Sequence, residues 1–241
     1  MDYREKFWAR YSSVVQQLGT PLELNRTDHW SRPFEYWMRG WMPPAKDAAI
    51  VDVACGAGNM LRYFTRLGYT NVSGLDISPP QVELARAIHP HVEVADALDF
   101  LRDNPGRFDL ILGFDVVEHL TKDELLVFTE RALAALRPRG RIILQTPNGA
   151  SPMVGEYRYG DFTHELCLTP KSLGQVLAIA GFADYEAREV APTPYRFTSA
   201  VRMVLWKLIR FRWILANRIE VGSPGPGIFT KNFIASARRP A

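Results

Sequence analysis

Four aspartates follow short apolar runs at intervals along the first half of the chain. Asp52 and Asp76 end the runs IVD and VSGLD, and Asp96 and Asp115 follow VEVA and LILGF. A carboxylate at the end of a strand can accept hydrogen bonds from ribose hydroxyls or from an exocyclic amine. A single aspartate in such a place can equally be the cap of the next helix. Four in succession favour a site for a nucleoside-type ligand at one edge of a sheet.

The segment 51–59, VDVACGAGN, joins the first of these runs to a region of helical pattern. Its small residues let the backbone approach a ligand closely, and Gly56 and Gly58 can adopt positive φ. The first N–H groups of the helix that follows have no partner within the helix and can face the ligand. A dinucleotide fingerprint requires G-x-G-x-x-G, but Leu61 stands three residues after Gly58. The segment therefore argues against a nicotinamide-dependent dehydrogenase.

Two histidines lie in polar segments further along the chain. His119 ends the run DVVEH, and His164 lies in the run GDFTHE. Transfer of a group to an alcohol is helped when the alcohol loses its proton to a base or a metal. Neutral histidine titrates near neutral pH, so either residue could be that base. The alternatives are that Glu118 and His119 only open a helix, and that the loop of His164 only packs on the domain.

These residues are carried by short apolar runs that alternate with helical patterns. We expect strands over 50–54, 72–76, 91–95, 110–114 and 141–145, and helices over 59–67, 79–88, 98–102 and 122–136. Such alternation predicts βαβ units in a parallel sheet with helices on both faces. A sheet of this kind binds its ligand at the carboxyl ends of its strands.

The regular alternation stops after Pro147. Residues 148–169 form a polar and aromatic insert, followed by a helix over 172–180 that ends at Gly181. Strands are expected over 183–190 and 231–237, on either side of a basic helical stretch. The chain is thus divided into an N-terminal helical segment, 1–47, and a ligand-binding domain, 48–241.

Over about residues 45–190 the chain resembles the class I S-adenosylmethionine (SAM)-dependent methyltransferases. The matching segments are DVACGAG, GLDIS, ADALDF, FDLILGFDVVEHL and LRPRGRIILQTPN. The resemblance implies an α/β fold of the Rossmann-like class, with a mostly parallel seven-stranded sheet and helices on both faces. It also implies that SAM is the cofactor and that the protein is an enzyme.

The same resemblance assigns cofactor-binding residues. It implies that Asp52, Ala54, Gly56 and Gly58 lie around the methionine part of SAM, Asp76 and Ile77 at the ribose, Asp96 and Ala97 near the adenine, and Phe114 beside the sulfonium. Ala54 departs from the usual glycine but is small enough to preserve the site.

The acid-x-x-Glu-His run resembles the corresponding segment of ubiquinone-pathway O-methyltransferases, which can hold a divalent cation near the acceptor oxygens. Carried over by position, the ligands are Asp115, Glu118 and His119, and such a set suits Mg²⁺ or Mn²⁺. Many methyltransferases with a similar run use no metal. Asp115, His119 and His164 are therefore the candidate catalytic residues, with the metal as an alternative.

The insert is where members of the family place residues that bind the acceptor. Its rings and hydrogen-bonding groups fit a sugar, and YGDFTH followed by LTPKSL looks like bacterial methyltransferases associated with surface polysaccharides. We therefore expect O-methylation of a sugar hydroxyl on a glycan or lipid-linked glycan. The alternatives are a phenolic or quinone-pathway lipid as acceptor, and a nucleotide-binding module without catalysis.

Two outlying segments have two interpretations each. In 199–219, apolar residues recur at helical spacing beside five basic residues and two tryptophans. This pattern predicts either contact with an anionic membrane surface, or packing on the sheet or on a second subunit.

The aromatic-rich segment 1–47 is either a lid over the cofactor or part of the core. Its aromatic residues are Phe7, Trp8, Tyr11, Trp30, Phe34, Tyr36, Trp37 and Trp41.

Composition limits the remaining classes of protein. The 241 residues are 47% hydrophobic and carry a net charge of +3, which is too small to indicate nucleic-acid binding. The two cysteines, Cys55 and Cys167, form neither a disulfide framework nor a zinc pattern and suit a reducing compartment. With no signal sequence and no uncharged apolar segment, we expect a cytoplasmic protein that can lie at the inner face of the membrane.

Overall fold

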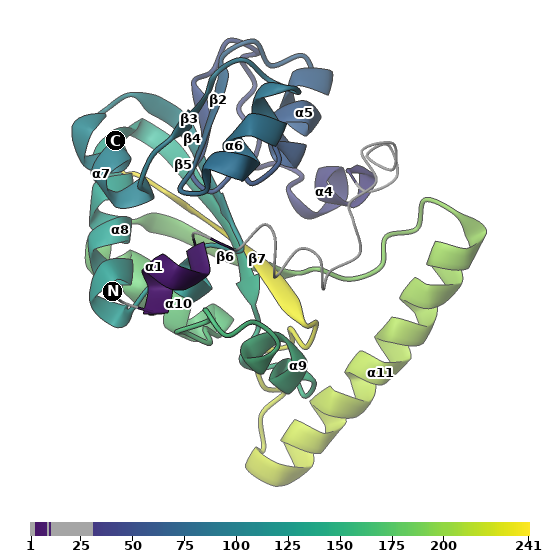
Figure 1. Ribbon diagram of the computed structural model, residues 1–241. Helices are drawn as coiled ribbons and strands as arrows, with labels where there is room; N and C mark the ends of the chain where they lie inside the picture. Colours follow the sequence, from purple (N-terminus) through teal and green to yellow (C-terminus); the bar gives the residue numbers. More distant parts are fainter. Residues whose placement is uncertain (1–2, 9, 11–30) are drawn as a thin grey trace.

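The computed structural model describes residues 3–8, 10 and 31–241 (Figure 1). The strands are β1 (Ile50–Asp52), β2 (Val72–Asp76), β3 (Val92–Val94), β4 (Phe108–Phe114), β5 (Leu136–Pro147), β6 (Ala183–Glu189) and β7 (Asn232–Arg238). The helices are α1 (Tyr3–Trp8), α4 (Arg32–Trp37), α5 (Asn59–Arg66), α6 (Pro79–Arg86), α7 (Ala97–Asp103), α8 (Lys122–Ala135), α9 (Val154–Tyr159), α10 (Pro170–Ala180) and α11 (Phe197–Val221), with a short 3₁₀ helix, η2 (Val117–His119). The strands and helices expected from the sequence are all present in this part of the chain.

Across the described residues, seven strands form one sheet in the order β3-β2-β1-β4-β5-β7-β6. The pairs β1–β2, β1–β4, β2–β3 and β4–β5 are parallel, whereas β7 runs antiparallel to both β5 and β6. The mostly parallel seven-stranded sheet with helices on both faces is thereby confirmed (Figure 1).

Alternate residues of the central strands enter two separate core clusters. In β4, Ile111 packs with Phe128 of α8 and Leu177 of α10, whereas Leu110 packs with Phe64 of α5 on the other face. This is the period-two pattern of a strand buried on both sides. The sheet is therefore held rigidly between two helical layers, and the loops at its carboxyl ends are free to form a site.

Several helices begin and end where local signals require it. Asp96 caps α7 by accepting hydrogen bonds from the N–H groups of Leu98 and Asp99 at 2.8 and 3.1 Å. Thr121 caps α8 in a capping box with Glu124. Gly181 ends α10 in the left-handed conformation, with φ 101°.

Several elements have other bounds than expected, and one element was not expected. β5 begins at Leu136, five residues before the expected strand, because Leu136 pairs with Phe108 ahead of an irregularity in the β4–β5 ladder. The insert contains a short helix, α9, that its mixed sequence did not indicate. The long helix α11 extends the expected 199–219 stretch by two residues at each end.

The described parts of the N-terminal segment have two different positions. Phe34 of α4 belongs to the core cluster on the α5 face, together with Met38 and Trp41. Arg4 of α1 contacts Glu124 at 2.7 Å and donates to the carbonyl of His119 at 2.6 Å. α1 thus contacts α8 and η2, and its role as a lid stays a prediction, whereas Phe34 and Trp41 are core residues. Tyr11 and Trp30 lie outside the described residues.

The α11 helix projects from the rest of the molecule (Figure 1). Most of its large apolar side chains are exposed, among them Phe197 at 84% and Ile219 at 80%. The prediction that this apolar side packs on the chain's own sheet is wrong, because the sheet's faces are already covered by the other helices. None of the helices in the described residues is long and apolar enough to cross a membrane.

Candidate functional site

A cavity of about 490 Å³ lies at the carboxyl ends of β1, β2 and β4 and beside the loop that follows β3. Its walls come from the loops after these four strands, from Arg4 of α1 and from Glu124 of α8. The other lining residues come from the strand ends, the loops after them and the first turns of the helices that follow: Val53, Ala54, Gly56, Asp76, Ile77, Ser78, Gln81, Ala95, Asp96, Ala97, Leu98, Asp115, Val116, His119 and Leu120. The sequence prediction that strand-end residues converge at one edge is confirmed by this geometry.

Asp76 holds the first two loops together and faces the cavity. Its two carboxylate oxygens accept hydrogen bonds from the N–H groups of Gly56 and Ser78, each at 2.9 Å. Burial raises the pKa of this carboxyl above its ordinary value. Each oxygen retains a further lone pair with which it can accept a ligand hydroxyl.

Asp96 combines the two roles that the sequence left open. Its Oδ1 caps α7, and the residue also lines the cavity beside Ala97. A helix cap at this position leaves the other carboxylate oxygen able to accept from an amine in the cavity. Helix capping and ligand binding are therefore compatible here.

Three predicted cofactor residues are not among those lining the cavity. Phe114 stacks on Phe34, with ring centroids 5.5 Å apart, and packs against the core on the α5 face. Gly58 begins α5 with φ 83°, and a Cβ there would lie 3.2 Å from Ala85. The role of Phe114 beside a sulfonium stays a prediction. Gly58 contributes to the site through its backbone conformation, which allows the loop after β1 to turn into α5.

Asp52, the third of them, lies almost fully buried at the end of β1. Burial raises the pKa of its carboxyl to about 7. Its Oδ1 has no hydrogen-bond partner in the described part of the chain. An unpartnered carboxylate oxygen behind the glycine-rich loop fits the positively charged amino group of an amino-acid ligand.

Gln81 and Ser78 are site residues that the sequence analysis missed. Both line the cavity and both are about 3% exposed. The amide oxygen and nitrogen of Gln81 and the hydroxyl of Ser78 lack partners among the described residues. A glutamine on the same side of α6 as the apolar Val82 and Ala85 was the available signal. Buried polar atoms around a cavity are the expected signature of a ligand that completes their hydrogen bonds.

Two acidic residues follow β4: Asp115 lines the cavity, and Glu118 of η2 is buried and is not one of the lining residues. Asp115 adopts φ 52° and accepts from the amide of Gln145, with both oxygens at 3.3 Å. Burial raises its pKa to about 6. Glu118 accepts from Thr146 at 3.0 Å, and burial together with the charge of Asp115 raises its pKa well above the ordinary value.

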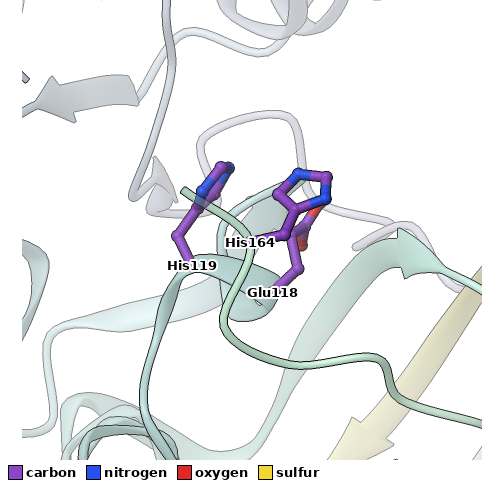
Figure 2. A group of neighbouring side chains, drawn as sticks. All are labelled: Glu118, His119 and His164. Carbon is purple, nitrogen blue, oxygen red and sulfur yellow. The ribbon is translucent and has the colours of Figure 1, made fainter. Parts of the chain in front are cut away.

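The two histidines come together although they are far apart in the sequence. The insert is tied to η2 because the N–H groups of Glu165 and Leu166 both donate to the carbonyl of Glu118. The rings of His119 and His164 thereby lie with centroids 4.8 Å apart (Figure 2). One donor atom from each of Glu118, His119 and His164 lies within 4.8 Å of the others. His164 joins this group, whereas the predicted third ligand Asp115 is not a member of it.

Hydrogen bonds determine which ring nitrogen of each histidine carries the proton. Nδ1 of His164 lies 2.7 Å from the carbonyl of Tyr157, which can only accept, so Nδ1 is the donor. The hydroxyl of Thr163 donates to Asp161 at 2.6 Å, so at 2.9 Å it accepts from Nδ1 of His119. In both rings Nε2 then carries the lone pair and can serve as a base or as a metal ligand.

Burial and the neighbouring His164 also lower the pKa of His119 to about 4. The ring is therefore neutral at physiological pH. Because His119 lines the cavity as well, it connects the cofactor-sized space to the histidine pair. The arrangement can remove a proton from a group held at the end of the cavity.

Comparison with known proteins points to one enzyme class. A family model described as a methyltransferase domain matches residues 15–187. The chain is similar to the ubiquinone biosynthesis O-methyltransferase of Chelativorans sp., with 29% identity over 167 residues, or 63% of this chain and 65% of that relative. A protein with the same printed name from Bradyrhizobium sp. is 34% identical over 103 residues, covering 41% of this chain and 40% of its own length. The chain thus matches less than two thirds of the length of these curated relatives.

Solved structures show the same fold at lower identity. A SAM-dependent methyltransferase from Archaeoglobus fulgidus has a TM-score of 0.64 at 18% identity, covering 98% of this chain and 100% of its own. One from Mesorhizobium loti has a TM-score of 0.59 at 23% identity, covering 84% of this chain and 95% of its own. Both therefore share the overall fold described above.

Proposed function

Because the chain belongs to the methyltransferase domain family, we propose that it transfers the methyl group of SAM to a hydroxyl oxygen of a phenolic acceptor of the quinone-pathway type. The observation that carries this proposal is the position of His119, which lines the cofactor-sized cavity and meets His164 and Glu118 on its other side. A proton acceptor at the end of the cofactor cavity is what O-methylation requires.

The wall residues suit the polar groups of SAM. Asp76 offers carboxylate oxygens to ribose hydroxyls, and Asp96 offers one to the adenine amine. Asp52 is buried next to the wall residue Val53, and its unpartnered carboxylate oxygen would suit the ammonium of the methionine part. Gln81 and Ser78 add buried donors and acceptors that a cofactor would satisfy. The chain thus has a complement for each end of the cofactor.

The reaction is a single displacement. A lone pair of the acceptor oxygen forms the new O–CH₃ bond while the S–CH₃ bond breaks, and the sulfonium becomes the neutral thioether of S-adenosylhomocysteine. The acceptor's proton passes to Nε2 of His119, whose Nδ1–H is held by Thr163. Positioning of the two reactants provides much of the rate, and proton removal adds a further factor of about 10²–10⁴.

The acceptor class follows from acidity and from the relatives. A phenol such as tyrosine has a pKa of about 10, far below the roughly 15.7 of water, so a neutral imidazole can deprotonate it more readily than an ordinary alcohol. The relatives named above are O-methyltransferases of ubiquinone biosynthesis by name. No comparison supports the sugar acceptor that the insert suggested.

The proposal is tested by incubating the purified protein with radiolabelled SAM and pairs of matched acceptors. We expect label in a catechol carrying a short alkyl chain and none in a methyl glycoside of similar size. Mass spectrometry of the product identifies the methylated oxygen. Label in the glycoside alone would instead support the polysaccharide interpretation, and binding of SAM without transfer to either would support a module without catalysis.

The donor set of Glu118, His119 and His164 also fits a divalent cation. One carboxylate with two imidazoles favours Mn²⁺ over Mg²⁺, because imidazole is a softer ligand than oxygen. When bound, such a cation would polarise the acceptor oxygens and ease loss of the phenolic proton. His119 uses Nε2 either as a base or as a ligand, so an experiment must separate the two roles.

Removal of metal is the first prediction. If the cluster binds a cation, rigorous chelation lowers turnover by at least about tenfold, and Mn²⁺ restores it better than Mg²⁺. Electron paramagnetic resonance titration should then show one Mn²⁺ per chain in the wild type and none in Glu118→Gln. Full activity after chelation, with no bound Mn²⁺, would leave His119 as a base alone and remove Glu118 and Asp115 as ligands.

The contact between Thr163 and His119 gives a second prediction. Thr163→Val retains the shape of the side chain but loses the hydroxyl that holds Nδ1–H, so kcat should fall by about 10–100-fold with KM for SAM unchanged. Thr163→Ser should restore most of the rate, because it restores the hydroxyl. Equal rates for the three proteins would mean that Thr163 has no positioning role.

A further inference from the structure

The side of α11 that faces away from the molecule is apolar. Seven residues repeat at intervals of three or four, so they lie along one side of the helix. They are Phe197, Val201, Val204, Leu208, Phe211, Leu215 and Ile219, and each is between 42% and 84% exposed. A surface helix normally turns such a stripe toward the core, so this orientation needs a different explanation.

The opposite side of α11 holds the helix to the domain through polar contacts. Trp206 donates its indole N–H to Glu189 of β6 at 3.0 Å, and Arg210 donates to the carbonyl of Gly227 at 2.7 Å. Ser199, on the same side, is the buried residue of the helix. These contacts fix which side of α11 faces outward, so the exposure of the apolar stripe is a property of the fold.

Basic residues accompany the apolar stripe. Lys207, Arg212 and Arg218 are exposed and lie three or four residues from members of the stripe, whereas Arg202 lies one turn before Trp206 on the side facing the domain. Glu220 is the acidic residue of α11. Arginine and lysine can lay their aliphatic stems along an apolar surface while their charges remain in a polar layer. We call Lys207, Arg212 and Arg218 together with the seven apolar residues the α11 outer surface.

We propose that the α11 outer surface docks in the headgroup region of an anionic lipid bilayer. The apolar stripe would enter the boundary with the acyl chains, and the three cations would contact lipid phosphates. The helix would lie in the plane of the bilayer.

Charge is the reason for choosing a membrane over a second copy of the chain. Packing two α11 outer surfaces against each other would bring both sets of three cations into a low-dielectric interface, where Glu220 is the acid that each helix offers. An anionic bilayer instead provides a negative charge for each of them. The surface therefore complements acidic lipid better than it complements itself.

The test measures co-sedimentation of the full chain with vesicles at low salt. We expect binding to vesicles of phosphatidylglycerol and little binding to phosphatidylcholine. Each basic residue near an anionic surface strengthens binding by about fivefold, so Lys207→Glu with Arg212→Glu should weaken it by at least about 25-fold. Val204→Gln, Leu208→Gln and Leu215→Gln together should also abolish binding, because they remove the apolar stripe and leave the charges.

A matched control separates this surface from overall charge. Lys122→Glu with Lys171→Glu makes the same change in net charge at exposed first turns of α8 and α10, where glutamate suits the helix dipole. This variant should bind phosphatidylglycerol vesicles nearly as well as the wild type. Thermal unfolding checks that all variants are folded.

Two results would overturn the proposal. One is wild-type protein that remains in the supernatant with phosphatidylglycerol vesicles at low salt. The other is equal loss of binding in the control and in the α11 charge variant. If the protein does not bind vesicles but is a dimer that dissociates when Val204→Gln, Leu208→Gln and Leu215→Gln are combined, the α11 outer surface is a subunit interface.

Discussion

Asp76→Ala is expected to weaken SAM binding by at least about 100-fold. The carboxylate lines the cavity with two oxygens, each able to accept a ribose hydroxyl in addition to the N–H group it already holds. A hydrogen bond to a charged group contributes about 1.5–3 kcal/mol, so losing two costs about 3 kcal/mol or more. Isothermal titration calorimetry with SAM measures the change directly.

The expected result depends on the loops remaining in place. Asp76 also joins Gly56 to Ser78, so circular dichroism and thermal unfolding must show that the variant is folded. Gln81→Leu provides a second variant that leaves Asp76 intact and removes the unpartnered amide; it should weaken SAM binding by about tenfold. Asp103→Ala, on the exposed side of α7, is the control and should leave affinity unchanged. Unchanged affinity in folded Asp76→Ala would refute the assignment.

His119→Ala is expected to lower kcat by about 10²–10⁴-fold while leaving the affinity for SAM within about twofold. His119 lines the cavity, but the polar groups proposed to hold the cofactor belong to Asp76, Asp96 and Gln81, so we expect SAM to bind without the imidazole. Single-turnover measurements with saturating SAM and a catechol acceptor separate chemistry from binding.

His164→Ala tests the neighbouring ring in the same assay. It should reduce kcat less than His119→Ala, because His164 is not among the residues that line the cavity. His91→Ala, at an exposed position before β3, is the control and should be without effect. If both His119→Ala and His164→Ala turned over at the wild-type rate, neither histidine would be the base.

The cofactor half of the site could be predicted from the sequence because its signals are local. A strand, its terminal aspartate and the small residues of the next turn are adjacent in the chain. Asp76, Asp96 and Gly56 can therefore be identified as candidate binding residues from the few residues around each of them. The fold then brings the carboxyl ends of parallel strands to one edge, which is a general property of such sheets. The seven-stranded sheet and its cofactor edge follow from these local patterns.

The reacting half was decided by tertiary structure. His164 is 45 residues from His119, and only the attachment of the insert to the carbonyl of Glu118 places their rings together. The same packing excludes Asp115 from the group of close donor atoms and includes His164 in it. No pattern along the chain contains this information, because it depends on which loop lies over which strand end.

The orientation of α11 is likewise a feature that the sequence pattern alone does not predict. Its periodicity determines that one side is apolar, but periodicity does not say what that side faces. Both faces of the sheet are already covered by other helices, and Trp206 and Arg210 hold the polar side of α11 against the domain. The sequence by itself therefore determined the helices and strands and the edge of the sheet at which the cofactor is expected. Competition among segments for the same packing surfaces decided that His119 and His164 meet and that the apolar stripe of α11 faces outward.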